Sequence, residues 1–267
     1  MIPSNPLLQL ACLFGASVVF LAQAGYGQSD DKAALALIER INGTFFDHDH
    51  RAEDALSTAF KDVSEGTMSD AWRYTYGLWQ YRRGSLVPAA DTTTTEGLKH
   101  AVDILAKVQP GPFKSEAEGL RSAVMGLLAG KGGMVGGMRY GTGSQSAAAK
   151  ALKMDPENPR VLLFAGINKS QTPAMWGGDR KEAVELFKKA IPRFEMQKPD
   201  APLKWGEAET YLWLGNTYWD LNDFEAAKAA FLTALRVQPN FKYVEKNRLK
   251  FLALDQQKSA AKTAPTN

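Results

Sequence analysis

The stretch AETYLWLGNTYWDLNDFEAAKAAFLTALRVQPN, residues 208–240, decides the fold of this chain. Two runs of helical periodicity flank a polar turn, and Asp223 is placed to cap the second helix. Gly215 and Ala227 remove side-chain bulk where two such helices would cross, and the aromatic residues fill the wedge between them. Pro239 then stops the second helix, because proline has no backbone N–H to continue it. The stretch predicts a closely packed antiparallel helix pair.

Counted from Ala208, the apolar, small and aromatic residues of this stretch stand at the positions that mark a tetratricopeptide repeat of 34 residues. These residues are Tyr211, Leu214, Gly215, Tyr218, Ala227, Phe231, Ala234 and Pro239. The chain therefore resembles the tetratricopeptide repeat family, with 208–241 as its best-matched repeat. The resemblance implies an all-α, right-handed superhelix of antiparallel helix pairs, a TPR-like solenoid. It also implies that the concave face, lined by each pair's first helix, binds a peptide or protein.

A second unit of the same kind lies upstream, but it is stretched. Leu162, Ala165 and Gly166 match the first helix, and Ala183, Phe187 and Ala190 match the second. The connector between them is five residues longer than the repeat allows, and the turn-rich segment 171–179 accounts for the excess. We expect Asp179, at the end of this insertion, to cap the second helix.

The rest of the chain is helical in pattern but less regular. Helical periodicity appears at about 32–46, 51–64, 68–83, 95–107 and 115–130, and no segment alternates like a strand. Helix pairs of this kind bury their apolar faces by stacking, which predicts one helical repeat domain over 28–257. Its last part, from Phe241 to about Gln257, is expected to be a capping helix. The tail 258–267 is predicted to be disordered.

The N-terminal residues differ from the rest in carrying no charged side chain before Asp30. An apolar stretch, Leu7–Leu21, is followed by Ala22-Gln23-Ala24, which is typical of a secretory signal cleaved after residue 24. The alternatives are a retained anchor and lipidation of Cys12, the only cysteine. At 15 residues the stretch is shorter than the ~20 that span a bilayer. We expect an exported bacterial protein, periplasmic or secreted, without stable membrane insertion after cleavage.

Composition narrows the possible chemistry. The 267 residues carry a net charge of +3 without a long basic run, which argues against nucleic acid as a partner. After cleavage no cysteine is left for thiolate chemistry, and the three histidines stand in no recognisable catalytic setting. The densest set of possible metal ligands, Asp47-His48-Asp49-His50, is interpreted as a helix connector in which Asp49 caps the next helix. We therefore expect no enzyme activity, no cofactor and no metal.

The glycine-rich stretch 130–144 does not match a phosphate-binding loop, because no lysine followed by Ser or Thr ends it and no strand precedes it. Gly133, Gly137 and Gly141 recur every four residues, as do Gly132 and Gly136. On a helix they would form smooth faces against which a neighbour packs. Glycine costs ~1 kcal/mol in a helix interior, so the alternative is a flexible loop.

The function predicted from these patterns is a non-enzymatic scaffold for protein–protein contact in the cell envelope. By analogy with the repeat, the residues expected to bind the partner in the groove are Arg160, Leu163, Glu209, Leu212, Asn216, Trp219 and Asp220. Trp176 and Asp179 of the insertion are expected at its rim. One alternative is a periplasmic adaptor that couples a solute-binding protein to a transporter. Another is a small-molecule binder that uses aromatic residues in the groove.

Overall fold

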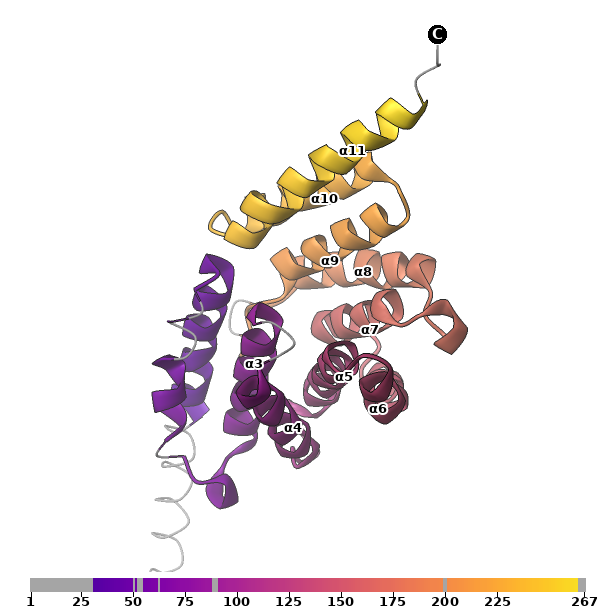
Figure 1. Ribbon diagram of the computed structural model, residues 1–267. Helices are drawn as coiled ribbons and strands as arrows, with labels where there is room; N and C mark the ends of the chain where they lie inside the picture. Colours follow the sequence, from indigo (N-terminus) through magenta and orange to yellow (C-terminus); the bar gives the residue numbers. More distant parts are fainter. Residues whose placement is uncertain are drawn as a thin grey trace, which may run out of the picture.

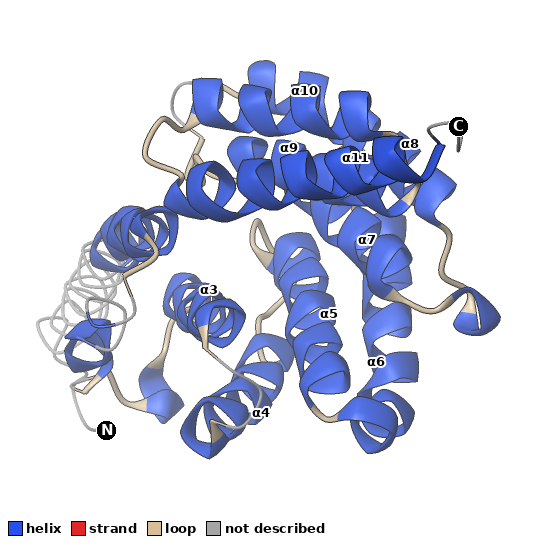
Figure 2. Ribbon diagram, turned by 45° about the horizontal axis from the view of Figure 1, so that its top comes forward, coloured by secondary structure: helices blue, strands red, loops and turns tan. Residues whose placement is uncertain are grey.

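The computed structural model describes residues 31–49, 51, 55–61, 63–87, 91–198 and 201–263, the last six of these by backbone alone. Within these ranges the chain forms helices and loops and no strand (Figure 2). The predicted signal segment, Cys12 and His50 lie outside the described residues. The predicted all-α class is confirmed.

Residues 31–47 form the N-terminal helix, and eight longer helices follow the short η1 (Leu56–Phe60) and η2 (Glu65–Thr67). They are α3 (Asp70–Leu86), α4 (Thr92–Ala106), α5 (Lys114–Lys131), α6 (Gly133–Met154), α7 (Pro159–Gln171), α8 (Arg180–Glu195), α9 (Glu207–Asp220) and α10 (Phe224–Val237). The insertion carries η3 (Ala174–Trp176), and the chain continues through η4 (Val244–Arg248) into α11 (Leu249–Thr263).

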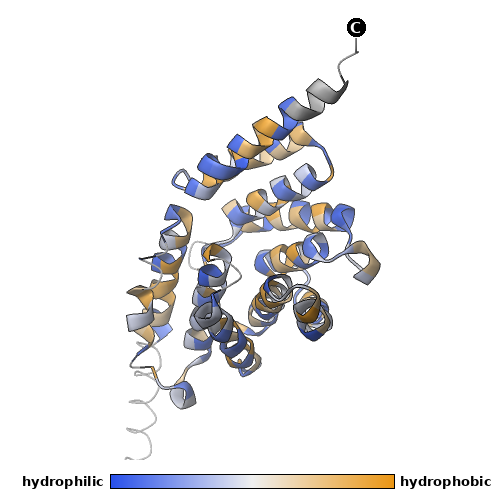
Figure 3. Ribbon diagram, in the orientation of Figure 1, coloured by the Kyte–Doolittle hydropathy of each residue, from blue (hydrophilic) through white to orange (hydrophobic). Residues whose placement is uncertain are grey.

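The helices α3 to α10 pack as four consecutive antiparallel pairs, each stacked on the next (Figure 1). Along them, hydrophobic and hydrophilic residues are interspersed, as expected for helices with one buried side (Figure 3). Stacking buries the apolar side of each pair in cores that run from one pair to the next. This arrangement is the predicted solenoid of helix pairs.

The two units recognised in the sequence are held by the same contact. In α7–α8, a Cβ placed on Gly166 would lie 2.5 Å from the ring of Phe187, and in α9–α10 a Cβ on Gly215 would lie 2.5 Å from the ring of Phe231. Glycine is required at both crossings, because any side chain would collide with the ring. The predicted N-caps are also present. Asp179 accepts hydrogen bonds from the N–H groups of residues 181 and 182, and Asp223 from that of residue 226.

The glycine-rich stretch is helical, as predicted, apart from Gly132: Gly130 and Lys131 end α5, and the rest of the stretch begins α6. Gly133 has a φ of 56°, which glycine adopts without strain. A Cβ on Gly136 would lie 2.7 Å from the carbonyl oxygen of Leu128 and 2.8 Å from that of Ala129. The glycines thus permit a turn so tight that α6 begins directly against the end of α5.

Two boundaries differ from the sequence prediction. In the predicted helix 51–64, the described residues include a 3-10 turn, Leu56–Phe60, and extended backbone from Val63. The ring of Phe60 stacks on Trp79 at 4.8 Å, and we attribute the turn to this tertiary contact overriding local periodicity. At the C-terminus α11 continues to Thr263, so the first residues of the predicted disordered tail are helical.

The two ends of the solenoid contact each other. Phe45 and Phe46 of the N-terminal helix lie 5.7 and 4.8 Å, centroid to centroid, from the ring of Phe241. Beside them, Asp47 forms an ion pair with Lys242 at 3.2 Å. The ring of His48 stacks on Tyr243 at 5.6 Å. Asp49 accepts a hydrogen bond from the N–H of residue 51, consistent with its predicted capping role. Two residues of the Asp-His cluster therefore join the first helix to the C-terminal cap.

Candidate binding groove

A groove of about 510 Å³ lies against the first helices of all four pairs, α3, α5, α7 and α9. The N-terminal half of α6 and the insertion after α7 complete its walls. Six of its lining residues are glycines, and at three of them, Gly130, Gly133 and Gly141, an added Cβ would meet nothing within 4 Å, so another chain can approach the backbone closely there. The six are Gly84, Gly126, Gly130, Gly133, Gly137 and Gly141.

The insertion after α7 forms one wall of the groove and is fixed by contacts with α6 and α7. At its end, the N–H of Asp179 donates to the carbonyl of Lys169 at 3.0 Å, and Gly178 stands so close to the carbonyl of Thr172 that no side chain fits there. In its middle, Gln145 of α6 donates to the carbonyl oxygen of Trp176 at 2.7 Å. The ring of Trp176 rests over Gly137, where a Cβ would lie 3.0 Å away. The smooth face predicted for α6 therefore receives the insertion's tryptophan.

Hydroxyl and amide groups line the groove where α5, α6 and α7 meet. Ser144 donates to the carbonyl oxygen of Ser122 at 2.8 Å, and the amide nitrogen of Asn168 donates to the hydroxyl of Ser144 at 2.8 Å. The amide oxygen of Asn168 accepts no hydrogen bond from the described residues, and Asn168 is only half-buried. The groove thus offers an acceptor for a ligand N–H group.

Aromatic side chains line the groove from three directions. Tyr81 comes from α3, Trp213 from α9 and Trp176 from the insertion. Trp176 also continues into an apolar lip that we define as Met134, Met138, Met175 and Trp176. Their exposed fractions are 78, 66, 84 and 42%. Exposed apolar side chains grouped beside a groove are typical of binding surfaces.

Among the residues that the structure describes, Lys131 is the only charged one that lines the groove. Its ammonium donates to the carbonyl oxygen of Val87 at 2.7 Å. Burial lowers the pKa of Lys131, while the charge of Asp91 acts in the opposite direction. Lys131 also lines a second hollow of about 230 Å³ on the other side of the α5–α6 turn, together with Lys99 and Arg139. Neither hollow is lined by an Asp or Glu among the described residues.

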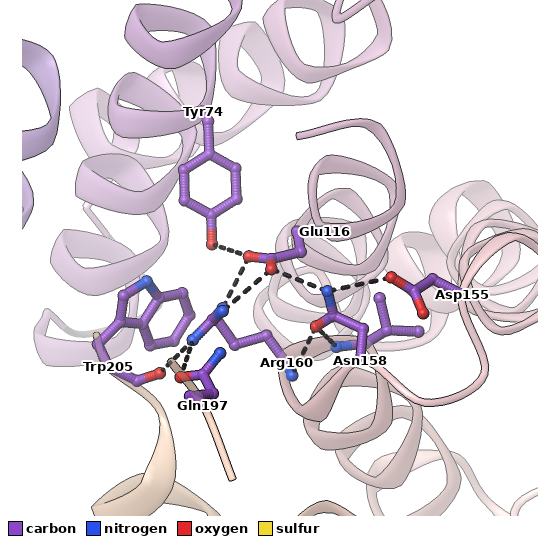
Figure 4. Close-up of polar contacts among 8 residues, drawn as sticks. Tyr74, Glu116, Asp155, Asn158, Arg160, Gln197 and Trp205 are labelled. Atoms are coloured by element: carbon purple, nitrogen blue, oxygen red, sulfur yellow. Dashed lines mark hydrogen bonds and ion pairs between the residues drawn. The ribbon is translucent and has the colours of Figure 1, made fainter. Parts of the chain in front are cut away.

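The seven residues predicted to bind the partner line neither hollow. Arg160 and Leu163 of α7 are buried. The guanidinium of Arg160 donates from Nε to Glu116 at 2.7 Å and from Nη1 to the carbonyl oxygen of Trp205 at 3.0 Å (Figure 4). Asn158, the N-cap of α7, and Tyr74 of α3 both donate to the same carboxylate (Figure 4). Arg160 is therefore part of the link between pairs.

Glu209 and Leu212 of α9 are buried as well. Glu209 forms a doubly hydrogen-bonded ion pair with Arg82 of α3, whose side chain is completely buried. Arg82 also donates to Asn42 at 2.8 Å and lies 4.2 Å from the ring centroid of Phe45, both in the N-terminal helix. The N-terminal helix, joined to α9 through Arg82, thus helps to bury the face of α9 that the repeat pattern assigns to a partner.

The other three predicted residues lie toward the end of α9. Trp219 is half-buried against Phe231 and Arg248, and Asp220 forms an exposed ion pair with Arg180 at 3.4 Å. Asn216 is also half-buried, and its buried amide oxygen has no hydrogen-bond partner among the described residues. The role of all seven in partner binding stays a prediction. Of the two rim residues, Trp176 lines the groove and Asp179 caps α8.

Sequence reasoning missed Asn168, Trp213, Lys131 and Gln145 as groove residues. Trp213 stands one position beyond Leu212, which was counted from the repeat pattern, and Asn168 lies beyond Leu163 in the same helix. Lys131 and Gln145 lie in and beside the glycine-rich stretch, which the sequence marked for helix packing and not for binding.

Comparison with known proteins identifies one repeat: the family model for the tetratricopeptide repeat matches residues 208–241. No curated protein matches the chain. Among the described residues, no helix combines the length and apolar character needed to cross a membrane. The same residues contain no group of three or more His, Cys, Asp or Glu side chains that could hold a metal ion.

Proposed function

We propose that this protein is a non-enzymatic scaffold that binds an extended segment of a partner protein in the groove between α6 and the first helices of the solenoid. A tetratricopeptide repeat suggests protein–protein contact, and the glycine-lined groove is the observation that supports this proposal. We place the function in a bacterial cell envelope, because the apolar stretch at residues 7–21 resembles a secretory signal.

An extended peptide suits the lining of the groove. The bare backbone at three of the glycines allows a second main chain to approach, and Asn168 presents a free acceptor for one of its N–H groups. Trp176 and Trp213 offer aromatic surfaces for apolar side chains. The groove also follows the ends of several helices in succession, so a chain laid along it would contact each pair in turn.

A small apolar ligand is the second candidate, because the volume of about 510 Å³ falls within the ~300–1,000 Å³ of small-molecule sites. The aromatic side chains from α3 and α9 would then form the sides of its pocket. A small molecule that co-purifies with the protein, and is lost when the groove is filled, would favour this candidate.

Gly141 provides the test, because it lines the groove and a Cβ there would meet nothing within 4 Å. Gly141→Leu therefore places its Cβ in open space and adds bulk to the groove wall, and Thr142→Leu, the exposed neighbouring position outside the lining, is the matched control. A displayed library of short random peptides is selected on the unmodified protein. Enriched peptides are expected to lose binding to Gly141→Leu and to keep it for Thr142→Leu. Equal binding to both variants, or no enrichment, would contradict the proposal.

A further inference from the structure

The charged residues in the two helices beside the groove are of one sign over a long segment. Between Glu118 and Asp155 the chain contains no acidic residue, but it contains five cations. These are Arg121, Lys131, Arg139, Lys150 and Lys153. The segment forms most of α5 and nearly all of α6, so the helices that wall the groove are basic as well as rich in glycine.

Two of the five cations form ion pairs within the fold. Arg121 and Lys150 both form ion pairs with Glu118, at 3.3 and 2.6 Å. Lys131 and Arg139 form no ion pair with a carboxylate of the described residues. The charge of Asp91 acts on Lys131, but one oxygen of that carboxylate already accepts the cap hydrogen bond from the N–H of Thr94 at 3.0 Å.

Two of the cations without an ion pair, Lys131 and Arg139, line hollows at the α5–α6 turn. Lys131 lines both hollows, which meet around the α5–α6 turn, and Arg139 lines the second hollow two turns into α6. An ammonium has three donors, and the fold uses only one of those of Lys131, toward Val87. Burying this charge under a bound segment would be costly unless the segment brought a carboxylate to it.

The apolar lip lies beside the same turn. Met138 is next to Gly137, which receives the ring of Trp176, and Met134 stands one helical turn before Met138. The α6 methionines of the lip and Arg139 therefore both belong to the N-terminal half of α6, which a segment leaving the groove at Lys131 would reach. Methionine adapts its shape to different apolar partners, so the lip fits an apolar anchor residue without strict shape demands.

We propose that the partner segment is acidic: it carries an Asp or Glu side chain that pairs with Lys131, a second toward Arg139, and an apolar residue against the lip. This inference rests on the proposed function and adds the chemistry of its ligand. Positively charged side chains line both hollows, one on each side of the α5–α6 turn, so we expect the bound segment to run from one hollow into the other and not to end between them. The paired groups are therefore side-chain carboxylates and not the free carboxyl terminus.

The test uses the peptides enriched on the full mature chain, synthesised with free and with amidated C-termini. Lys131→Gln is expected to weaken binding on the order of tenfold and Arg139→Gln a few-fold, as for partly buried and exposed charge pairs. Lys153→Gln is the matched control, since Lys153 is an exposed α6 cation outside both hollows. Amidation should leave the affinity unchanged, and added salt should lower it for the unmodified protein more than for Lys131→Gln.

The outcomes separate the two proposals. Enriched peptides without acidic residues, blocked by Gly141→Leu but indifferent to Lys131→Gln and Arg139→Gln, would overturn the acidic ligand and leave the groove assignment standing. Loss of binding on amidation would overturn the side-chain carboxylate. Lys131→Gln also removes the hydrogen bond to the carbonyl oxygen of Val87, so its effect on binding includes any change in the fold. Arg139 is exposed, so a loss of binding in Arg139→Gln reports on the lost charge without this complication.

Discussion

The α7–α8 and α9–α10 units share one packing contact and differ in almost everything a partner would encounter. Both cross at a glycine pressed on a phenylalanine ring, with the same 2.5 Å approach for an added Cβ. In α9–α10 the connector is a short turn that ends in Asn222, whose φ of 62° only a few residue types tolerate. In α7–α8 the connector is the insertion that places Trp176 on α6.

The difference teaches that the unit most like the family is not the unit most open to a partner. Residues 208–241 match the repeat model, yet their first helix has Glu209 tied to Arg82 and Leu212 in the core. The stretched unit matches less well, and its insertion and Asn168 form part of the groove. The candidate site therefore lies where the sequence departs from the repeat pattern.

The largest expected effect tests whether the face of α9 that was expected to bind a partner is instead covered by Arg82 of the same chain. Glu209→Ala leaves Arg82 buried without its carboxylate, which is expected to lower the free energy of unfolding by about 3–5 kcal/mol. Denaturant unfolding followed by circular dichroism measures it. The control is Glu185→Ala, which removes an exposed ion pair and should change stability by less than ~1 kcal/mol. Similar values for both variants would mean that the Arg82 link does not hold the solenoid.

The next effect tests the shared contact. Gly166→Ala and Gly215→Ala each force a phenylalanine ring to move, at a cost of about 1–3 kcal/mol, and the ~1 kcal/mol gain in helix propensity offsets part of it. Thermal unfolding of both variants should show similar losses. Gly141→Ala, whose Cβ enters open space, should be stabilising by up to ~1 kcal/mol. Clearly unequal losses for the two glycines would show that the crossings are not equivalent.

A smaller effect depends on pH. Burial raises the pKa of Glu118, but the hydrogen bond from Lys150 and the charges of Lys150, Arg121 and Lys114 outweigh burial and hold the pKa below its ordinary 4.5. A carboxyl whose pKa is lowered on folding adds stability above that ordinary value and loses it as the pH falls through the folded pKa. The stability difference between the unmodified protein and Glu118→Gln should therefore shrink between neutral pH and about pH 3. A difference independent of pH would contradict this cause.

The smallest effect is expected at the ion pair that joins the two units, Arg180 with Asp220. Arg180→Ala removes an exposed contact with Asp220 and should change the free energy of unfolding by no more than about 0.5 kcal/mol. A loss as large as that of Gly166→Ala would mean that the units are held together by surface charge.

Local features were predictable from the sequence because they depend on neighbours in the chain. The helix pair 208–239, the caps Asp179 and Asp223 and the helical glycine stretch are of this kind. The ion pair between Arg82 and Glu209 joins residues 127 positions apart, and no periodicity reveals it. Because this pair and the N-terminal helix bury the expected face of α9, positions transferred from the repeat pattern missed the groove.

The most direct test of the groove is site-specific photo-cross-linking in intact cells of the host. A benzophenone side chain replaces Trp176 in one variant and Trp219 in another, and mass spectrometry identifies the cross-linked products. Our account predicts a defined partner protein from position 176, lost in the presence of Gly141→Leu, and none from position 219. A partner captured at 219 and not at 176 would contradict it and place binding on the face of α9.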